Sequence, residues 1–147
     1  MDALDRKILN ITQKNSRITV KQIAEECFIS SPSVSVRLQN LESLGYIRTY
    51  QAVLDHQKLG FLIKAYVNCA VNAKDKQDFY RYIEEIPNVV ECDCITGDYS
   101  MLLKVYFTNT IELDEFITDL QRFGDTKTHI VFSTNVGPRG LQIQIKE

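Results

Sequence analysis

The feature that most constrains the fold is a pair of short helices in the first third of the chain, each with its own N-terminal cap. Thr19 is followed three residues later by Gln22, the spacing of a capping box in which each side chain satisfies a backbone N–H. Ser30 is a candidate N-cap for the second helix, because Pro32 follows in the first turn, where its missing N–H costs nothing. Gly45 is expected to end that helix, since a left-handed residue is least strained as glycine.

The second helix has an apolar face and a polar face. Val34, Leu38 and Leu41 recur at helical spacing and are expected to be buried. The polar face and leading turn have no acidic residue before Glu42 and carry Ser31, Ser33, Ser35, Arg37, Gln39 and Asn40. Such side chains suit a DNA groove, where they can contact base edges or phosphates. Residues 19–47 are therefore a candidate helix-turn-helix, although an ordinary helical hairpin has the same pattern.

A further helix is predicted over residues 2–14, with Asp2 as its candidate N-cap. The three helices form an expected DNA-binding domain, winged-helix-like, at residues 1–47. Residues 47–54 are rich in β-forming side chains, so residues 48–60 are interpreted as a linking strand followed by a turn.

From residue 61 to the end, the pattern predicts a second domain. Its expected strands cover residues 61–71, 89–96, 101–107 and 128–135, and its expected helices cover residues 75–86 and 111–123. The order β-α-β-β-α-β predicts a ferredoxin-like antiparallel sheet with both helices on one face, so the fold class is α+β. The uncovered face needs a partner, because Tyr66, Tyr106, Phe107 and Val131 cannot all point inward. We expect a second copy of the chain to cover this face.

The last residues, 137–147, alternate between apolar and polar side chains. This pattern predicts an edge strand, added either within the chain or to a neighbouring subunit.

Composition is that of a folded protein, with 44% hydrophobic and 24% charged residues in 147. The N-terminus does not resemble a signal peptide, and no apolar run approaches the ~20 residues of a membrane span, so a cytoplasmic location without a membrane partner is expected. The net charge is −2, but residues 1–60 hold 8 Lys and Arg against 6 Asp and Glu. The slightly basic N-terminal part agrees with a DNA partner.

Cys92, Cys94 and His129 are the one candidate metal cluster, since residues two apart on a strand face the same way. A second Cys pair is missing and cysteine is a common core residue, so packing is the favoured interpretation and no metal or cofactor is expected. Glu91, Asp93 and Asp98 lie near a turn, but no nucleophile, phosphate loop or catalytic signature accompanies them. An enzyme is therefore not expected.

Several motifs together resemble the N-terminal signature of the Lrp/AsnC, or feast/famine, transcriptional regulators of prokaryotes. They are Leu4-Asp5, Ile8-Leu9, Ser16-Arg17-Ile18-Thr19, Ile23-Ala24, Ile29-Ser30, Val34, Arg37, Leu41-Glu42, Gly45 and Ile47. The resemblance continues through Lys58-Leu59-Gly60 and Gly97-Asp98-Tyr99, so it spans essentially the whole chain in the right order.

The resemblance implies an effector site at Gly97, Asp98, Tyr99 and Ser100. In the family this loop lies between dimers and binds a free amino acid, and an aspartate and exposed N–H groups suit an ammonium and a carboxylate. Where the family pattern continues with Asp and an aromatic residue, this chain has Ser100 and Met101. The same residues also describe a simple hairpin turn.

The sequence therefore predicts an oligomeric, sequence-specific transcriptional regulator. Its expected partners are double-stranded DNA, a second copy in a dimer that assembles further into a tetramer or octamer, and a small amino acid. One alternative is a chromosome-organising protein that wraps DNA with low specificity. An alternative of another class is a stand-alone amino-acid sensor or metabolic enzyme built on the sheet domain.

Overall fold

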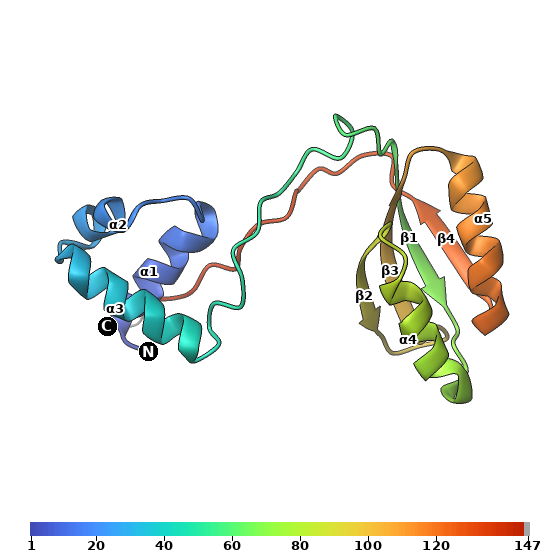
Figure 1. Cartoon of the computed structure of the whole chain (residues 1–147), viewed down its shortest axis with the longest axis horizontal. Coiled ribbons are helices and arrows are strands. Elements are labelled where there is room, and N and C mark those ends of the chain that lie inside the picture. Colours follow the sequence, from blue (N-terminus) through green and yellow to red (C-terminus); the bar gives the residue numbers. More distant parts are fainter. Residues whose placement is uncertain (146–147) are drawn as a thin grey trace. The chain divides into compact units, whose positions relative to one another are not determined.

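The computed structural model describes residues 1–145, and the chain divides into two compact units (Figure 1). The first unit holds Met1–Leu54 and the C-terminal segment that starts at Val136, and the second holds Asp55–Asn135. From the sequence, the first domain was expected to end at residue 47, and the C-terminal segment was expected to belong to the sheet domain. The two divisions differ because this segment lies against the first helix.

The first unit contains three helices, α1 (Ala3–Lys14), α2 (Val20–Cys27) and α3 (Ser31–Ser43). The predicted capping box is present, since the Gln22 N–H donates to Thr19 Oγ1 over 3.2 Å and the Thr19 N–H donates to Gln22 Oε1 over 3.0 Å. At the start of α3, the Ser33 N–H donates to Ser30 Oγ over 3.4 Å, and Pro32 lies in the first turn. Local capping therefore explains where α2 and α3 begin.

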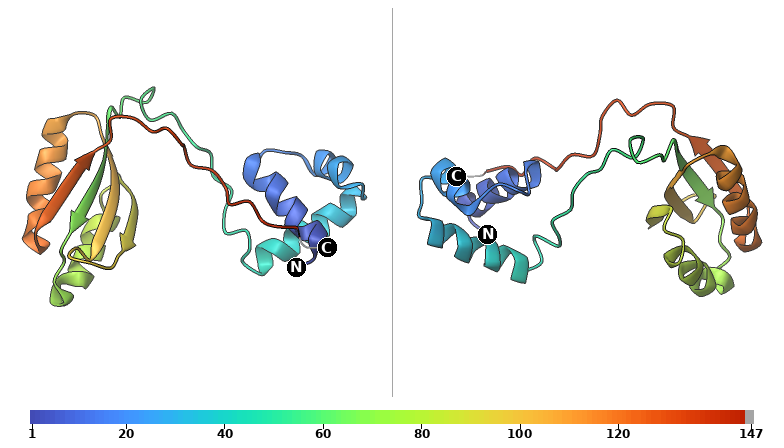
Figure 2. Two further views of the ribbon diagram at one scale, coloured as in Figure 1. Left: turned by 180° about the vertical axis from the view of Figure 1, so that it is seen from behind. Right: turned by 45° about the horizontal axis from the view of Figure 1, so that its top comes forward.

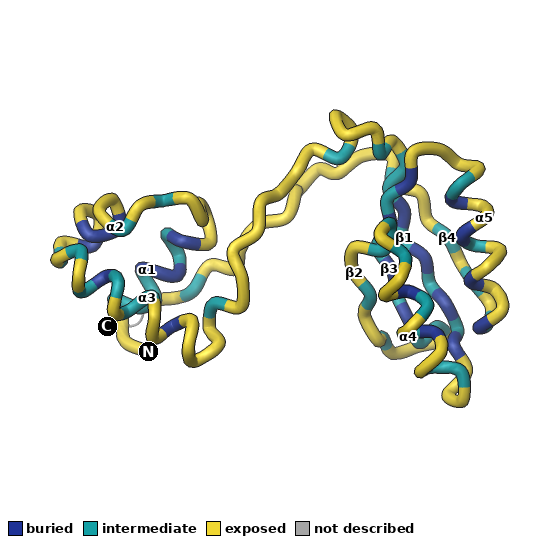
Figure 3. The backbone as a smooth tube through the Cα atoms, in the orientation of Figure 1, coloured by how far each residue is buried: buried dark blue, intermediate teal, exposed yellow. Residues whose placement is uncertain are grey.

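These three helices enclose one apolar core, visible as the dark positions on their inner sides in Figure 3. Its buried members are Ile8, Leu9, Ile23, Ala24, Cys27, Val34 and Leu41. Leu38 packs against the edge of this core, so the predicted buried face of α3 is confirmed. Each large aliphatic side chain among them contributes about 1.5–3 kcal/mol through burial.

The C-terminal segment runs beside α1, as both views in Figure 2 show. Asn10 binds the backbone of Ile143 on both sides: its Nδ2 donates to the carbonyl over 2.7 Å and its Oδ1 accepts from the N–H over 2.9 Å. Arg6 donates to the carbonyl of Gln144 over 3.0 Å, and Gln13 to that of Leu141. Of the two predicted alternatives, an edge strand within the chain is not formed over the described residues 137–145, because side chains of α1 satisfy part of this backbone instead.

The linking strand expected at residues 47–54 is also not formed, and this stretch has irregular, largely exposed backbone. A strand needs a neighbour that accepts and donates its hydrogen bonds, and these residues have none among those that the structure describes. The turn that follows is present and ends at Gly60, whose φ is +90°.

The second unit is a four-stranded antiparallel sheet with two helices. Its elements are β1 (Ile63–Cys69), a 3-10 turn (Ala73–Asp75), α4 (Lys76–Glu84), β2 (Val89–Cys94), β3 (Met101–Phe107), α5 (Thr110–Leu120), a second 3-10 turn (Gln121–Phe123) and β4 (Thr126–Ile130). The strand order is β2-β3-β1-β4, so the two halves interleave as a ferredoxin-like fold requires. Among the described residues, no helix is long and apolar enough to span a membrane.

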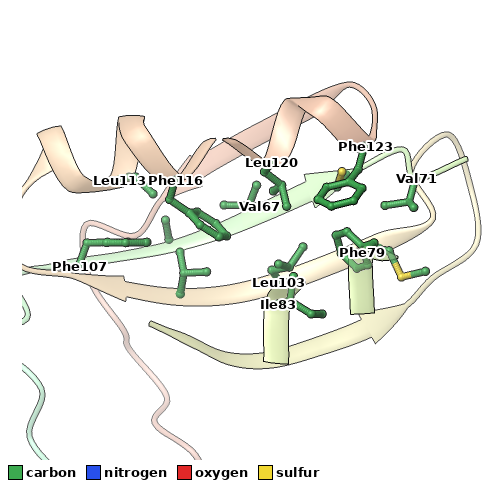
Figure 4. Packing of buried hydrophobic residues seen from close by; sticks show 14 residues of the cluster. Val67, Val71, Phe79, Ile83, Leu103, Phe107, Leu113, Phe116, Leu120 and Phe123 are labelled. Carbon is green, nitrogen blue, oxygen red and sulfur yellow. The ribbon is translucent and has the colours of Figure 1, made fainter. Parts of the chain in front are cut away.

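Both helices cover the same face of this sheet. Figure 4 shows α4 and α5 placing Phe79, Ile83, Leu113, Phe116 and Leu120 over Val67 and Leu103 of the central strands. The prediction of two helices on one face is therefore confirmed. Phe107 belongs to this core and is 5% exposed, so it points inward, whereas its neighbour Tyr106 lies on the other face. The register of β1 and β3 pairs Phe107 with Ile63, on the side that carries the helices.

The opposite face of the sheet carries no helix. Tyr66 and Tyr106 lie there, as predicted, together with Lys64, Asn68, Leu102 and Lys104 from the same two central strands. His56 covers part of this face, since its ring stacks on Tyr106 with centroids 3.8 Å apart. The rest is left partly exposed.

Candidate nucleic-acid interface and effector loop

The outward face of α3 is set by the packing of its other face. Because Val34 and Leu41 point into the helical core, the residues about half a turn away are exposed. Gln39 and Asn40 are exposed there, as expected for groove contacts. Ser33 and Ser35 are at the two flanks, and Ser31 is half-buried in the first turn.

Ser35 has a partner within the helix, since its Oγ donates to the Ser31 carbonyl over 3.2 Å. This bond to the carbonyl four residues earlier is common for serine in helices and leaves the oxygen free to accept. The predicted serines are thus brought together on the leading turns, but they are less accessible than Gln39 and Asn40.

Arg37 points away from the outward face and toward α1. Its Nη1 donates to Asp2 Oδ2 over 2.7 Å and to Asp5 Oδ1 over 2.6 Å, and its side chain is 29% exposed. These bonds raise the pKa of the Arg37 guanidinium. The backbone N–H of Asp5 and then Arg37 lower the pKa of Asp2. Arg37 therefore joins α3 to the first turn of α1, an interaction that the sequence pattern did not indicate.

Glu42, the acidic residue of α3, accepts from the Tyr50 hydroxyl over 2.7 Å. Burial, and then this bond to Glu42, raise the pKa of Tyr50 to about 12. Both charged side chains of α3 are thus engaged by other parts of the same unit.

Val36 is a surface residue of α3 that the sequence pattern could have revealed but that was not among the predicted site residues. Its side chain is 56% exposed and lies on the outward face beside Gln39 and Asn40. It also lines a shallow hollow of about 620 Å³ that includes Pro32, Ser33 and Asn40. The signal was available in the helical phase, since Val36 lies opposite Val34, Leu38 and Leu41.

The four residues of the candidate effector site form one turn between β2 and β3. Gly97 and Asp98 are exposed, Tyr99 is half-buried, and Gly97 has a φ of +109° that favours glycine. Ser100 is engaged with the end of β1, because its Oγ accepts from the Val71 N–H over 3.0 Å and lies 3.2 Å from the Val71 carbonyl. Gly97 and Asp98 are therefore the accessible members.

The cysteines and His129 do not meet. Cys92 pairs with Leu103 on the helix-covered face, whereas His129 pairs with Tyr66 on the uncovered face. The strands that carry them, β2 and β4, are at opposite edges of the sheet, about three strand spacings apart. Burial raises the pKa of Cys92 to about 11, as expected for a packing role rather than for a thiolate ligand.

Comparison with known proteins matches both units. Residues 1–48 match the model of a winged helix-turn-helix DNA-binding domain, and residues 64–140 match that of the Lrp/AsnC ligand binding domain. The chain is 31% identical to the HTH-type transcriptional regulator LrpC of Bacillus subtilis, over 90% of this chain and 92% of that one.

Solved structures agree with this match. The B. subtilis LrpC structure superposes with a TM-score of 0.88 at 30% identity, covering 94% of this chain and 99% of that one. A transcriptional regulator of Neisseria meningitidis, solved as a complex with L-Met, gives a TM-score of 0.88 at 25% identity and covers 93% of both chains. The helix-turn-helix unit, the ferredoxin-like sheet and their order along the chain are thus shared, and the chain belongs to the Lrp/AsnC family of transcriptional regulators.

Proposed function

We propose that the protein regulates transcription by placing the outward face of α3 in the major groove of double-stranded DNA. The observation that carries this proposal is the composition of that face. Gln39, Asn40 and the flanking serines are neutral hydrogen-bonding groups, while both charged side chains of α3 are paired with other residues of the same unit. Such a face can approach bases without leaving a buried charge unpaired.

Selection of bound sequences from random DNA tests this proposal directly. The wild type is expected to enrich one motif, and the variant Gln39→Ala/Asn40→Ala is expected to lose that enrichment with little change in melting temperature. Gln77→Ala, in α4 of the second unit, is the matched control. An unchanged motif in the double variant would place recognition elsewhere, and binding without any enriched motif would favour the DNA-wrapping alternative.

The proposal includes a dimer formed through the second unit. The uncovered sheet face exposes part of Tyr66, Leu102 and Tyr106, and Phe132 beyond it is 100% exposed. Two helix-turn-helix units on one dimer bind two half-sites about one helical turn apart, which raises the effective concentration of the second unit.

Sedimentation at micromolar concentration measures the assembly. The wild type is expected to be a dimer or an assembly of dimers, such as a tetramer or octamer. Leu102→Glu places a charge on the uncovered face beside Asp93, its partner in the register, and is expected to lower the mass. Ile111→Glu, on an exposed position of α5, is the control that keeps the wild-type mass. A monomeric wild type contradicts the proposed dimer.

The proposal further assigns Gly97, Asp98 and Tyr99 to effector binding, with Ser100 holding their loop to β1. Exposed Asp98 can pair with the ammonium group of a free amino acid. A panel of amino acids that includes L-methionine is expected to contain one that shifts the sedimentation or DNA affinity of the wild type but not of Asp98→Ala. Asp114→Ala, an exposed aspartate of α5, should keep the response. A panel without any shift contradicts this assignment.

A further inference from the structure

The outward face of α3 places an exposed apolar side chain beside two amides. Val36 is 56% exposed and has no part in the helical core. Gln39 and Asn40 follow it by three and four residues, so all three side chains are neighbours on the helix surface. They form one continuous surface on the outward side of α3.

The basic residue nearest this surface is Arg37, which lines the same hollow as Val36 and Asn40 but is already paired. Arg37, the one basic residue of α3, donates from the same Nη1 atom to Asp2 and to Asp5. Guanine is most often read by an arginine or lysine that donates to its O6 and N7 atoms. With Arg37 held against α1, α3 lacks the usual group for reading guanine.

The groups that remain match an A·T pair. An amide of Gln or Asn can donate to adenine N7 and accept from the adenine N6 amino group, and an aliphatic side chain packs on the C5 methyl group of thymine. We infer that Val36 is a specificity-determining residue that contacts a thymine methyl group, while Gln39 or Asn40 reads the adenine edge of the same or the adjoining pair.

This inference rests on the proposed binding of DNA by α3, and base analogues test it separately. In the motif selected by the wild type, each thymine in turn is replaced by deoxyuridine, which lacks the methyl group, and affinity is measured. At one position per half-site, replacing thymine by deoxyuridine should weaken binding of the wild type about fourfold. This is the effect expected from the loss of one buried methyl group. Val36→Ala should bind the two forms of that site equally.

Val53→Ala is the matched control, because Val53 is an exposed valine of the same unit outside α3. It should keep the wild-type ratio between thymine and deoxyuridine sites. Replacing adenines by 7-deazaadenine, which lacks the N7 acceptor, should weaken the wild type about fivefold at one position and leave Gln39→Ala or Asn40→Ala insensitive there.

The outcomes separate the two claims. Absence of DNA binding would overturn the proposed function itself. A selected motif that is insensitive to deoxyuridine at every thymine, or a Val36→Ala variant that keeps the wild-type ratio, would overturn only the role of Val36. A motif that requires guanine, and no A·T pair, at the positions contacted by α3 would also overturn the role of Val36.

Discussion

Arg37 Nη1 donates to Asp5 Oδ1 over 2.6 Å, and this bond joins α3 to the first turn of α1. The same nitrogen donates to Asp2, whose side chain also caps α1 by accepting from the Asp5 N–H over 2.8 Å. The cap of one helix and the orientation of another therefore depend on the same two carboxylates. The sequence suggested a DNA contact for Arg37, and the geometry points to a positioning role.

The first prediction concerns the stability that Arg37 supplies. Arg37→Ala is expected to lower the free energy of unfolding, by about 1 kcal/mol for its pair with half-buried Asp5. In a double-mutant cycle, the effects of Arg37→Ala and Asp5→Asn should be less than additive because both remove the same bond. Urea denaturation measures each variant. Arg48→Ala, an exposed arginine of the same unit, should stay within about 0.5 kcal/mol of the wild type.

Binding at several salt concentrations then distinguishes positioning from a direct role at phosphate. If Arg37 neutralised a phosphate, Arg37→Ala would flatten the plot of log affinity against log salt by about one unit. A positioning role instead predicts weaker binding with a nearly unchanged slope. A variant with wild-type stability and a flattened slope would restore the direct DNA interaction suggested by the sequence.

The second prediction is a dependence of stability on acid pH. The Asp5 N–H and Arg37 lower the pKa of Asp2 from its ordinary value of 3.8. A carboxylate with a depressed pKa in the folded state stabilises that state above its unfolded pKa, and this contribution is lost as the pH falls through the folded pKa. Asp2→Asn should therefore reduce stability at pH 6, and this difference from the wild type should shrink below about pH 4. A difference that is constant between about pH 6 and pH 3 would contradict the prediction.

The third prediction concerns the approach of two segments at Gly124. The φ of Gly124 is +151°, and a Cβ there would overlap the carbonyl of Ala70, whose N–H bonds to the neighbouring Asp125 carbonyl over 2.8 Å. Gly124→Ala should lower the stability of the second unit by more than about 2 kcal/mol, because backbone rather than a flexible side chain must move. Gly137→Ala is the control, since among the described residues, its own chain neighbours aside, no atom lies within 4 Å of the position that its added methyl group would take. Equal melting temperatures for the two variants would contradict the argument.

The fourth prediction concerns Phe28, which ends α2 in the left-handed conformation with φ +58° and is 90% exposed. That conformation costs a non-glycine residue roughly 1 kcal/mol, so Phe28→Gly should raise the melting temperature by a few degrees. The ring also lies 5.6 Å from Lys7 Nζ. Phe28→Ala separates the two effects: it removes the ring but keeps the strain, so it should be less stable than Phe28→Gly. A Phe28→Gly variant less stable than the wild type would show that the ring's interaction with Lys7 outweighs the strain.

Local residue chemistry determined where the elements begin and what type they are. The starts of α2 and α3 were predictable because Thr19 with Gln22, and Ser30 with Ser33, satisfy backbone groups only three residues away. The period of apolar residues likewise identified the buried face of α3 and the β-α-β-β-α-β order. The family resemblance rested on the same local motifs, and it agrees with the ferredoxin-like sheet that the structure shows.

Relationships between distant residues were decided only by the tertiary structure. Arg37 has three plausible acidic neighbours by charge alone, and the packing of α3 on α1 selects Asp2 and Asp5 instead of Glu42. The pattern did not decide which of Tyr106 and Phe107 points inward, because the face of a strand residue depends on its register with a partner strand. The C-terminal segment alternates apolar and polar residues as a strand does, but the Asn10 side chain of α1 forms hydrogen bonds with its backbone at Ile143. In each case the sequence pattern allows more than one partner or face, and only the geometry of the folded chain selects among them.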